Sequence, residues 1–250
     1  MKREAQIFAL AVQFLTRLPV PPDLPFSEAR LTEATKFFPL VGLLVGAIGA
    51  GVLWVAALVL PVPVAVLLSV AATIAATGAF HEDGLADTAD GLGGGLTRDR
   101  ALEIMRDSRI GTYGTVTLGL VLALKVTALS AMPLAVAVPL VALGHGISRY
   151  APVAVVFTAP YARETGAKFV APTISAGGHA LAAGMALGLL GLLVWAIGPA
   201  ALAGAGAAAL LAAAIARVYL RKLGGFTGDC LGATQQMAET GLILGVLAWP

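Results

Sequence analysis

Long apolar runs separated by short breaks occupy most of the chain from residue 39 onward. Each run has roughly 18 to 25 residues, enough for a helix to cross a hydrocarbon core about 30 Å thick. The apolar residues are continuous and do not alternate with polar ones, so a transmembrane β-barrel is not expected. The pattern predicts an all-α fold, a polytopic transmembrane helical bundle that forms one domain over residues 1–250. We expect about seven spans, near residues 39–60, 62–80, 115–132, 134–158, 180–197, 199–219 and 231–249.

A shorter apolar stretch, from Gln6 to Leu18, comes before these runs. Gln6, Gln13 and Arg17 recur at i, i+7 and i+11, which places them in one stripe along a helix. At about 12 residues the stretch is too short to span a bilayer, so we expect an N-terminal interfacial helix that lies on the membrane. A cleaved signal peptide is less favoured, because prolines follow where a small-residue cleavage site would stand.

Charged residues gather on one side of the predicted bundle. The loops 1–38, 81–114, 159–179 and 220–230 fall on the same side and carry 13 of the 16 Lys and Arg residues. The other three, Lys125, Arg149 and Arg217, lie inside apolar runs, and the opposite side carries no charge. Under the positive-inside rule the charged side faces the cytoplasm, so we expect a cytoplasmic substrate.

Composition agrees with a membrane protein. The chain is 58% hydrophobic and 12% charged, whereas soluble domains carry about 25% charged residues. An ordinary soluble fold is therefore excluded. The net charge of +2 is too small to indicate a nucleic-acid partner, and the single Cys230 allows no internal disulfide.

An acidic cluster follows the second predicted span. If a helix continues past Phe80, then Asp83, Asp87 and Asp90 share one face at i, i+4 and i+7. Like charges this close destabilise a helix unless a cation neutralises them, and oxygen ligands favour a hard ion such as Mg²⁺. Glu82 lies off this stripe and could orient the site or act as a base. The alternative is a solvated acidic helix end, but 4 of the 14 acidic residues lie within these nine residues.

A glycine-rich segment and a second short helix come next. We expect Gly91 and the glycines at 93–95 to end the acidic helix, since glycine accepts a left-handed cap. This segment could let phosphate approach the backbone or could be a plain hinge. Thr97 is then expected to cap a short cytoplasmic helix that reaches about Ser108.

Mixed charges follow in this short helix and its C-terminal end. Arg106 and Arg109 could bind phosphate bidentately, with Asp107 adding a carboxylate. The alternative is a set of surface ion pairs that contribute little. We favour the phosphate-binding interpretation, because this loop must fold back over the acidic helix.

Two cations lie deep within the predicted spans. Lys125 and Arg149 are each about ten residues, or about 15 Å, from the charged side. Charges at such depth face a bundle interior or a watery cavity. Glu239, preceded by Gln235 and Gln236, is the candidate partner.

The last charged loop, residues 224–232, contains Thr227 and Asp229 among four glycines. Asp229 could be only a helix cap. We favour the interpretation that it brings a further carboxylate or phosphate contact to the site.

Together these segments resemble the cobalamin synthase family, the adenosylcobinamide-GDP ribazoletransferases. The most specific matches are His-Glu-Asp-Gly-Leu-Ala-Asp-Thr-Ala-Asp-Gly at 81–91 and Met-Arg-Asp-Ser-Arg at 105–109. The matching stretches are residues 14–20, 38–42, 80–95, 103–114, 148–149 and 224–232.

The resemblance implies an integral membrane, Mg²⁺-dependent transferase in the inner membrane of a prokaryote, with its active site facing the cytoplasm. A ribose hydroxyl of α-ribazole, or of its 5′-phosphate, would attack adenosylcobinamide-GDP and release GMP. The substrates and the lipid bilayer are the expected partners, without nucleic acid; a homo-oligomer or an association with other cobalamin-assembly enzymes stays open.

The resemblance and the residue chemistry together give each candidate residue an expected role. The expected metal ligands are Asp83, Asp87 and Asp90; the substrate-binding residues are Arg106, Arg109, Arg149, Lys125 and Thr227; and the candidates for the general base are Glu82, Asp107 and Asp229.

Three other classes of protein are alternatives to this family. A phosphatidyl-type alcohol phosphotransferase has the pattern Asp-x-x-Asp-Gly-x-x-Ala-Arg, whereas here Asp87 and not Arg follows Ala86. A transporter would use Lys125, Arg149 and Glu239 as a path and would need access from both faces, but one face here is uncharged. A non-catalytic scaffold would give no reason for the acidic cluster.

Overall fold

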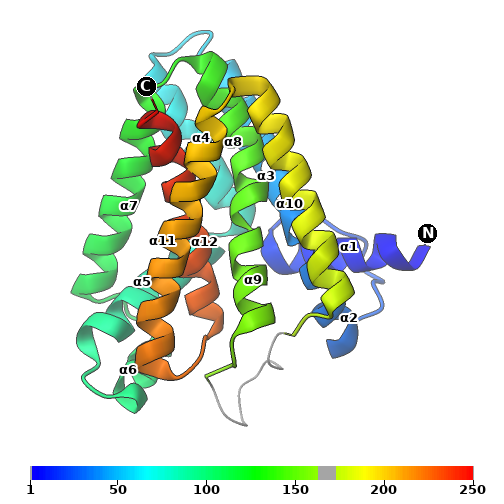
Figure 1. The fold of residues 1–250 in the computed structure, drawn as a ribbon, viewed down its shortest axis with the longest axis vertical. Coiled ribbons are helices and arrows are strands. Elements are labelled where there is room, and N and C mark those ends of the chain that lie inside the picture. Colours follow the sequence, from blue (N-terminus) through cyan, green and yellow to red (C-terminus); the bar gives the residue numbers. More distant parts are fainter. Residues whose placement is uncertain (1, 163–172, 250) are drawn as a thin grey trace.

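Long apolar helices run side by side and form the frame of the protein (Figure 1). The computed structural model describes residues 2–162 and 173–249; Arg163 and Lys168 of the charged loop 159–179 lie outside them. The elements are α1 (Lys2–Leu15), α2 (Glu28–Ala34), the short 3-10 helix η1 (Thr35–Phe37), α3 (Phe38–Ala56), α4 (Val62–Thr77), α5 (Phe80–Gly94), α6 (Arg98–Ile104), α7 (Thr112–Ser130), α8 (Leu134–Ser148), α9 (Tyr150–Thr158), α10 (Ala176–Ile197), α11 (Ala200–Leu223) and α12 (Gly228–Leu247). Apart from an isolated bridge between Tyr161 and Phe226, the described residues form no strand.

Five helical segments are long and apolar enough to cross a membrane, which confirms the membrane-bundle fold class. These segments are Glu28–Ala56, Thr112–Ser130, Leu134–Thr158, Ala176–Ile197 and Ala200–Leu223. The count differs from the seven predicted spans in two places. The 62–80 run is only the 16-residue α4, which meets α5 at an angle of 89° and forms a sixth span only if the bent pair is counted as one. The seventh predicted span, 231–249, is α12.

The helix α12 is central and polar rather than apolar. It packs against α5, α7, α8, α9 and α11, and most of its residues are buried. Its buried residues include the polar side chains Thr234, Gln235, Gln236, Glu239 and Thr240. In a bilayer such side chains have to face the bundle interior, so the helix lies within the protein rather than against lipid.

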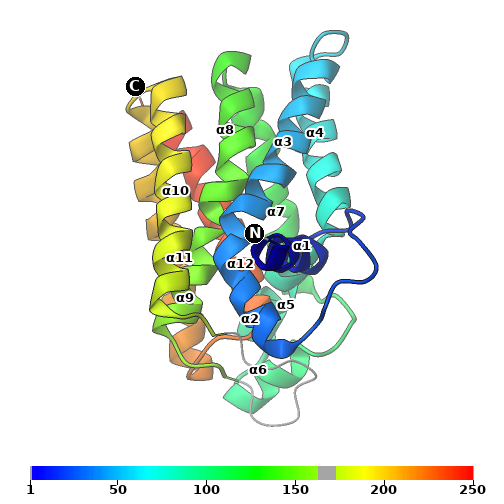
Figure 2. The same cartoon turned by 90° about the vertical axis from the view of Figure 1, so that its right-hand side faces the viewer.

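The N-terminal helix α1 lies across the bundle, as expected for an interfacial helix. Figure 1 shows it side-on, and Figure 2 shows it nearly end-on beside α3. Its apolar face, formed by Ile7, Leu10, Ala11 and Leu15, packs against Ala34, Phe37 and Val41 in one buried cluster. This contact buries one side of α1 and leaves Gln13 and Arg17 exposed.

The short helix α6 begins where the sequence predicts and ends earlier. The Thr97 hydroxyl accepts a hydrogen bond from the Arg100 amide, which confirms the predicted cap. The helix ends at Ile104, with Met105 as its C-cap, and so does not reach Ser108 as predicted. The glycine run 93–95 ends α5 as predicted, since the last helical residue is Gly94. The helix continues through Gly91, and the cap at Gly95 is extended, so the predicted left-handed cap was wrong.

Candidate active site

The acidic helix α5 is a new helix and not a continuation of the preceding span. Gly78 and Ala79 both have left-handed backbones, with φ of 66° and 59°, and they redirect the chain by 89°. The Arg17 amide donates to the Ala76 carbonyl at 2.7 Å. A Cβ on Gly78 would lie 2.5 Å from Arg17 Nε, so this side chain would have to shift, and the left-handed φ of 66° itself favours glycine. The common face of the three aspartates required a helix past Phe80, and α5 supplies it, as a separate helix that begins at Phe80 after the bend.

The three aspartates of α5 differ in exposure. Asp83 is exposed, Asp87 is half-buried and Asp90 is buried. The two Asp90 carboxylate oxygens accept hydrogen bonds from the backbone amides of Gly111 (2.7 Å) and Gly114 (2.8 Å) at the start of α7. A carboxylate at a helix N-terminus satisfies unpaired amides and complements the helix dipole. Asp90 therefore fixes the C-terminal half of α5 to α7.

The carboxylate oxygens of Asp83, Asp87 and Asp90 are ligands that suit a hard cation, but they do not form a complete metal site by themselves. Within the ranges 2–162 and 173–249, no three His, Cys, Asp or Glu side chains are grouped closely enough to hold a metal ion by themselves. Proteins often bind Mg²⁺ through one or two carboxylates together with substrate phosphates. The three-aspartate metal site therefore stays a prediction, and two of its members, Asp83 and Asp87, are the ones that reach solvent.

The first turn of α12 lies directly against α5. A Cβ on Gly84 would lie 2.8 Å from the Asp229 carbonyl oxygen, and one on Gly232 would lie 3.1 Å from the His81 carbonyl oxygen. The two backbones thus touch through glycines. The Asp229 backbone thereby lies beside the acidic helix, and the carboxylate or phosphate contact expected from Asp229 stays a prediction. Thr227 is fully buried, and its hydroxyl accepts from the Cys230 amide as the cap of α12.

The loop after α6 carries an exposed ion pair and an unpaired cation. The Arg109 guanidinium donates to both Asp107 oxygens, with the shortest distance 2.6 Å. These bonds lower the pKa of the Asp107 carboxyl to about 2. A base works best with a pKa near the operating pH, so Asp107 is a weak candidate for the general base. The Arg106 guanidinium is exposed and has no hydrogen-bond partner among the described residues, so it is available to an anionic ligand.

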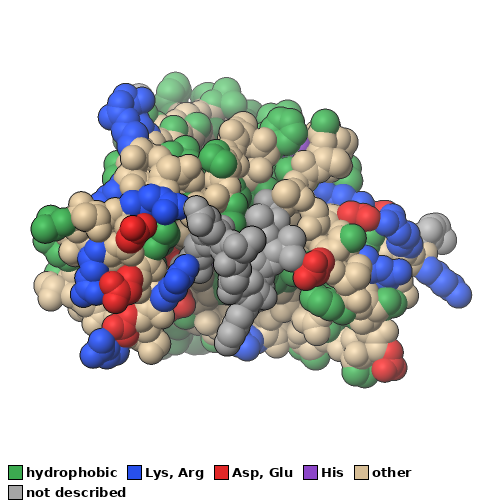
Figure 3. All heavy atoms as spheres, turned by 90° about the horizontal axis from the view of Figure 1, so that it is seen from below, with side chains coloured by type: hydrophobic (Ala, Val, Ile, Leu, Met, Phe, Trp, Pro, Cys, Tyr) green, Lys and Arg blue, Asp and Glu red, His purple; other side chains and the backbone are tan. Residues whose placement is uncertain are grey.

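Charged side chains of both signs gather on the face that contains α6 (Figure 3). Arg98 holds α6 in place by donating to the carbonyls of Leu223 (2.8 Å) and Ala162 (2.7 Å). Lys222 donates to the Leu92 carbonyl near the end of α5. These bonds attach α5 and α6 to the end of α11. The acidic helix α5 therefore shares one face of the bundle with the loop 105–111, which contains Arg106 and Arg109 and is called the arginine loop below.

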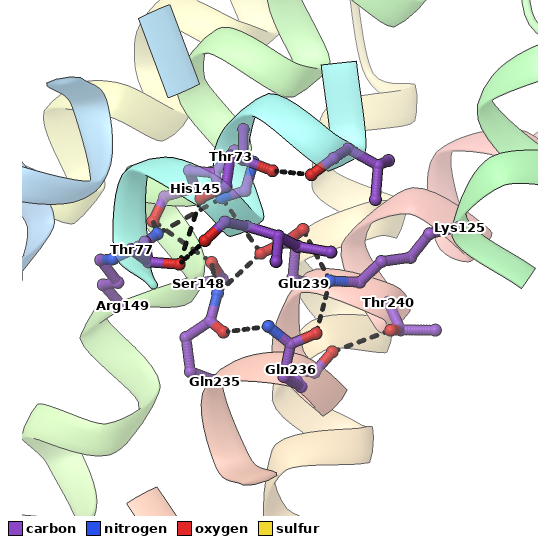
Figure 4. Close-up of polar contacts among 12 residues, drawn as sticks. Thr73, Thr77, Lys125, His145, Ser148, Arg149, Gln235, Gln236, Glu239 and Thr240 are labelled. Carbon is purple, nitrogen blue, oxygen red and sulfur yellow. Dashed lines mark hydrogen bonds and ion pairs between the residues drawn. The ribbon is translucent and has the colours of Figure 1, made fainter. Parts of the chain in front are cut away.

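A second polar group lies in the bundle interior (Figure 4). The Lys125 ammonium donates to Glu239 Oε1 at 2.8 Å and to Gln236 Oε1 at 2.6 Å. This confirms Glu239 as the partner of Lys125. His145 Nδ1 lies 3.2 Å from Glu239 Oε2, which also accepts from Gln235 Nε2 at 2.7 Å. Gln236 Nε2 in turn donates to Glu82 Oε1 at 2.9 Å, a link to α5 that the sequence analysis missed because the two residues lie 154 positions apart.

Arg149 lies at the junction of α8 and α9 and is 2% exposed. Its Nη1 donates to the His145 carbonyl at 2.8 Å, and its Nε has no partner within the described chain. The structure does not group Lys125 and Arg149 with the arginine loop. Substrate binding by Lys125, Arg149 and Thr227 stays a prediction.

Comparison with known proteins gives a consistent result. The family model described as Cobalamin-5-phosphate synthase matches residues 7–247. Proteins named adenosylcobinamide-GDP ribazoletransferase are similar over nearly their whole length. The one from Leptothrix cholodnii is 46% identical, with 98% of this chain and 96% of the relative covered. The one from Ralstonia nicotianae is also 46% identical, with 96% and 94% covered, and the one from Shewanella amazonensis is 43% identical, with 95% and 93% covered.

No solved structure matches the chain. The relatives and the family model nonetheless cover both the acidic helix α5 and the polar helix α12, the two elements that meet at the candidate site. The chain therefore belongs to the cobalamin-5-phosphate synthase family.

Proposed function

We propose that this chain transfers the adenosylcobinamide-phosphate group from adenosylcobinamide-GDP to a ribose hydroxyl of α-ribazole or of its 5′-phosphate. The new bond joins the ribose oxygen to the cobinamide-side phosphorus, the diphosphate bond breaks, GMP leaves and the hydroxyl proton is released. The observation that carries the proposal is the near-full-length identity to relatives with this name. The acidic stripe of α5, on the same face as the exposed Arg106, supplies the chemistry that a diphosphate donor requires.

We assign the parts of the site as follows. Arg106 contacts the diphosphate, since its exposed guanidinium has no partner in the described ranges. Asp83 and Asp87 would hold Mg²⁺, because their carboxylates lie on one face of α5 and hard oxygen ligands suit this ion. When bound, the ion neutralises negative charge on the phosphate oxygens. Asp90 keeps α5 against α7 through its bonds to Gly111 and Gly114.

Two carboxylates remain as candidates for the base. Asp229 lies where α12 touches α5 at Gly84, the residue next to Asp83 in sequence, and we favour it for accepting the hydroxyl proton. Glu82 is buried and bonded to Gln236, which suits a residue that orients the helix.

We place the charged face in the cytoplasm of a prokaryotic cell, at the inner membrane. The basis is the gathering of Lys and Arg residues on that face (Figure 3). Both substrates would then reach α5 without crossing the bilayer.

The test is an assay of purified protein in lipid nanodiscs with adenosylcobinamide-GDP, α-ribazole and Mg²⁺. We expect cobamide and GMP in equal amounts, and no product when a chelator is present. Asp87→Asn should lose at least about a hundredfold in kcat while it folds normally, because half of a charge-neutralising ligand pair is removed. Asp99→Asn is the matched control, since this carboxylate on α6 is 91% exposed and only loosely paired.

Each negative result would contradict a different part of the proposal. Folded wild-type protein that forms no cobamide with either form of α-ribazole would contradict the transferase function. Product formation that persists in chelator would contradict only the metal, and full activity of Asp87→Asn would remove that residue from the site.

A further inference from the structure

The buried side chain of Glu82 is held by a single hydrogen bond. Its Oε1 accepts from Gln236 Nε2 at 2.9 Å, whereas its Oε2 has no partner among the described residues. Glu82 is 8% exposed, in the first turn of α5 and next to Asp83 in sequence. A cavity of about 20 Å³ borders Glu82, Lys125 and Glu239, which is room for about one water molecule.

The orientation of the Gln236 amide is fixed by Lys125. An ammonium group can only donate hydrogen bonds, so it must meet the amide oxygen, and the two atoms are 2.6 Å apart. The amide nitrogen then faces Glu82 and Gln235, whose oxygens both accept from it at 2.9 Å. A flipped amide would set its NH₂ group against the ammonium and its oxygen against the Glu82 carboxylate. Lys125 therefore determines which end of Gln236 faces α5.

The contact between α5 and α12 needs such a polar bond. Gly84 and Gly232 let the two backbones touch, and the side chains beside them are apolar, with Leu85 of α5 and Ala233 of α12 in one buried cluster. Apolar contacts are non-directional. A buried polar contact at a helix interface can fix register and orientation. The Gln236 bond acts on the first turn, and the Asp90 bonds to α7 act on the last two turns.

We propose that Gln236 and Lys125 are positioning residues that act through Glu82. Their bonds fix the rotation of α5, so that Asp83 and Asp87 face the substrate side. The inference rests on the proposed transferase function, and it gives Lys125 a role in the bundle interior in place of contact with substrate. Glu239 holds Lys125 at the correct depth through its 2.8 Å ion pair.

The test is a kinetic double-mutant cycle in nanodiscs with Gln236→Met and Glu82→Met. Methionine has a similar length and polarity low enough for the core, but it neither donates to Glu82 nor accepts from Lys125 in a comparable way. We expect Gln236→Met to lower kcat about tenfold with both KM values nearly unchanged. In the Glu82→Met background no oxygen remains to accept from the Gln236 amide, so the same change should have almost no further effect.

Thr234→Val is the matched control on the same helix. Thr234 is fully buried and bonds Tyr219 and the Cys230 carbonyl, so its loss costs a buried hydrogen bond without a link to Glu82. We expect Thr234→Val to lower thermal stability and to keep kcat. If Gln236→Met does not fold, Gln236→Asn takes its place, since it keeps the amide and withdraws it from Glu82 by one methylene.

Other outcomes would overturn the inference. Additive effects in the cycle would show that Gln236 does not act through Glu82. A raised KM with unchanged kcat would indicate substrate contact, and equal kcat in folded Gln236→Met would leave only a structural role. If the wild-type protein itself makes no cobamide, the proposed function fails, whereas an active wild type with an additive cycle overturns the positioning role alone.

Discussion

The ionised side chains of this protein fall into two groups that differ in exposure. Asp107 and Arg109 form a pair that is 38% and 86% exposed, whereas the side chains of Lys125 and Glu239 are 4% and 9% exposed. Exposed pairs contribute little to stability. Removing one partner of a buried pair is costly, because the other charge stays buried without compensation. The exposed group is therefore free to serve ligands, and the buried group serves the structure of the site.

The pH dependence of the reaction tests the role of Asp107. Since Arg109 lowers the pKa of Asp107 to about 2, this carboxylate stays ionised at every pH near neutrality and protonates only as the pH falls towards that value. We expect Asp107→Asn to leave the acidic limb of the kcat/KM profile in place. The measurement is the rate of cobamide formation as a function of pH for both proteins. An acidic limb that disappears in Asp107→Asn would instead identify Asp107 as the base.

Residue-level reasoning from the sequence succeeded where spacing was local. The shared face of Asp83, Asp87 and Asp90 follows from helical geometry, and the cap at Thr97 is a local preference. The Gln236 bond to Glu82 could not be predicted in this way, because it joins residues 154 positions apart. The pairing of Arg109 with Asp107 was weighed as a surface ion pair, and that is the contact the structure contains.

At the scale of elements, the bend between α4 and α5 is the feature on which the site depends. Two consecutive left-handed residues make the bend, and one of them, Ala79, is not glycine. A left-handed backbone costs a non-glycine residue about 1–2 kcal/mol. The bend is nevertheless held, because Arg17 lies against Gly78 and Phe14 contacts Phe80 with ring centroids 5.4 Å apart. The interfacial helix α1 therefore supports the acidic helix.

Substitutions at the bend should have opposite effects. We expect Gly78→Ala to lower the free energy of unfolding by about 1–2 kcal/mol or more, since the new Cβ is both strained and too close to Arg17. Ala79→Gly should keep or raise stability, because it relieves the strain at φ 59°. Thermal unfolding in nanodiscs, followed by tryptophan fluorescence, measures both.

Gly51→Ala is the control for an added methyl group, as a Cβ there meets no atom within 4 Å. Equal losses in Gly78→Ala and Gly51→Ala would contradict the assigned role of the bend.

Hydropathy alone could not predict the bend before α5 or the burial of α12, because it reports only how apolar a segment is. Hydropathy identifies a helix that faces lipid, and the five long apolar segments were all found in this way. It does not identify the bend, because Gly78 and Ala79 are compatible with an apolar run. Nor does it distinguish α12, whose polar residues are satisfied by neighbouring helices.

The whole molecule is polar at one end. Charged side chains gather on the face around α6 (Figure 3), and the loops at the other end carry none. The acidic helix and the arginine loop lie on the charged face. The hydrogen-bonded side chains of Lys125, Gln235, Gln236 and Glu239 lie farther inside the bundle. This arrangement suits a reaction at the surface of a membrane better than passage through it, which would need access from both faces.

The 16-residue helix α4 gives the bilayer itself a part in the geometry of the site. At 1.5 Å per residue it is about 24 Å long, shorter than a hydrocarbon core of about 30 Å. A short helix is accommodated when the lipid thins around it, at a fraction of a kcal/mol per Å of mismatch. Because α5 departs from its end at 89°, any change in the depth of α4 is passed on to the acidic helix.

Membrane thickness should therefore set the rate of the reaction. In nanodiscs whose lipids share one head group and differ in acyl-chain length, we expect about a threefold fall in kcat for a few Å of added thickness. A rate that does not change with chain length would contradict this coupling. If the rate does change, the lipid composition of the cell acts as a regulator of this enzyme without binding to any site on it.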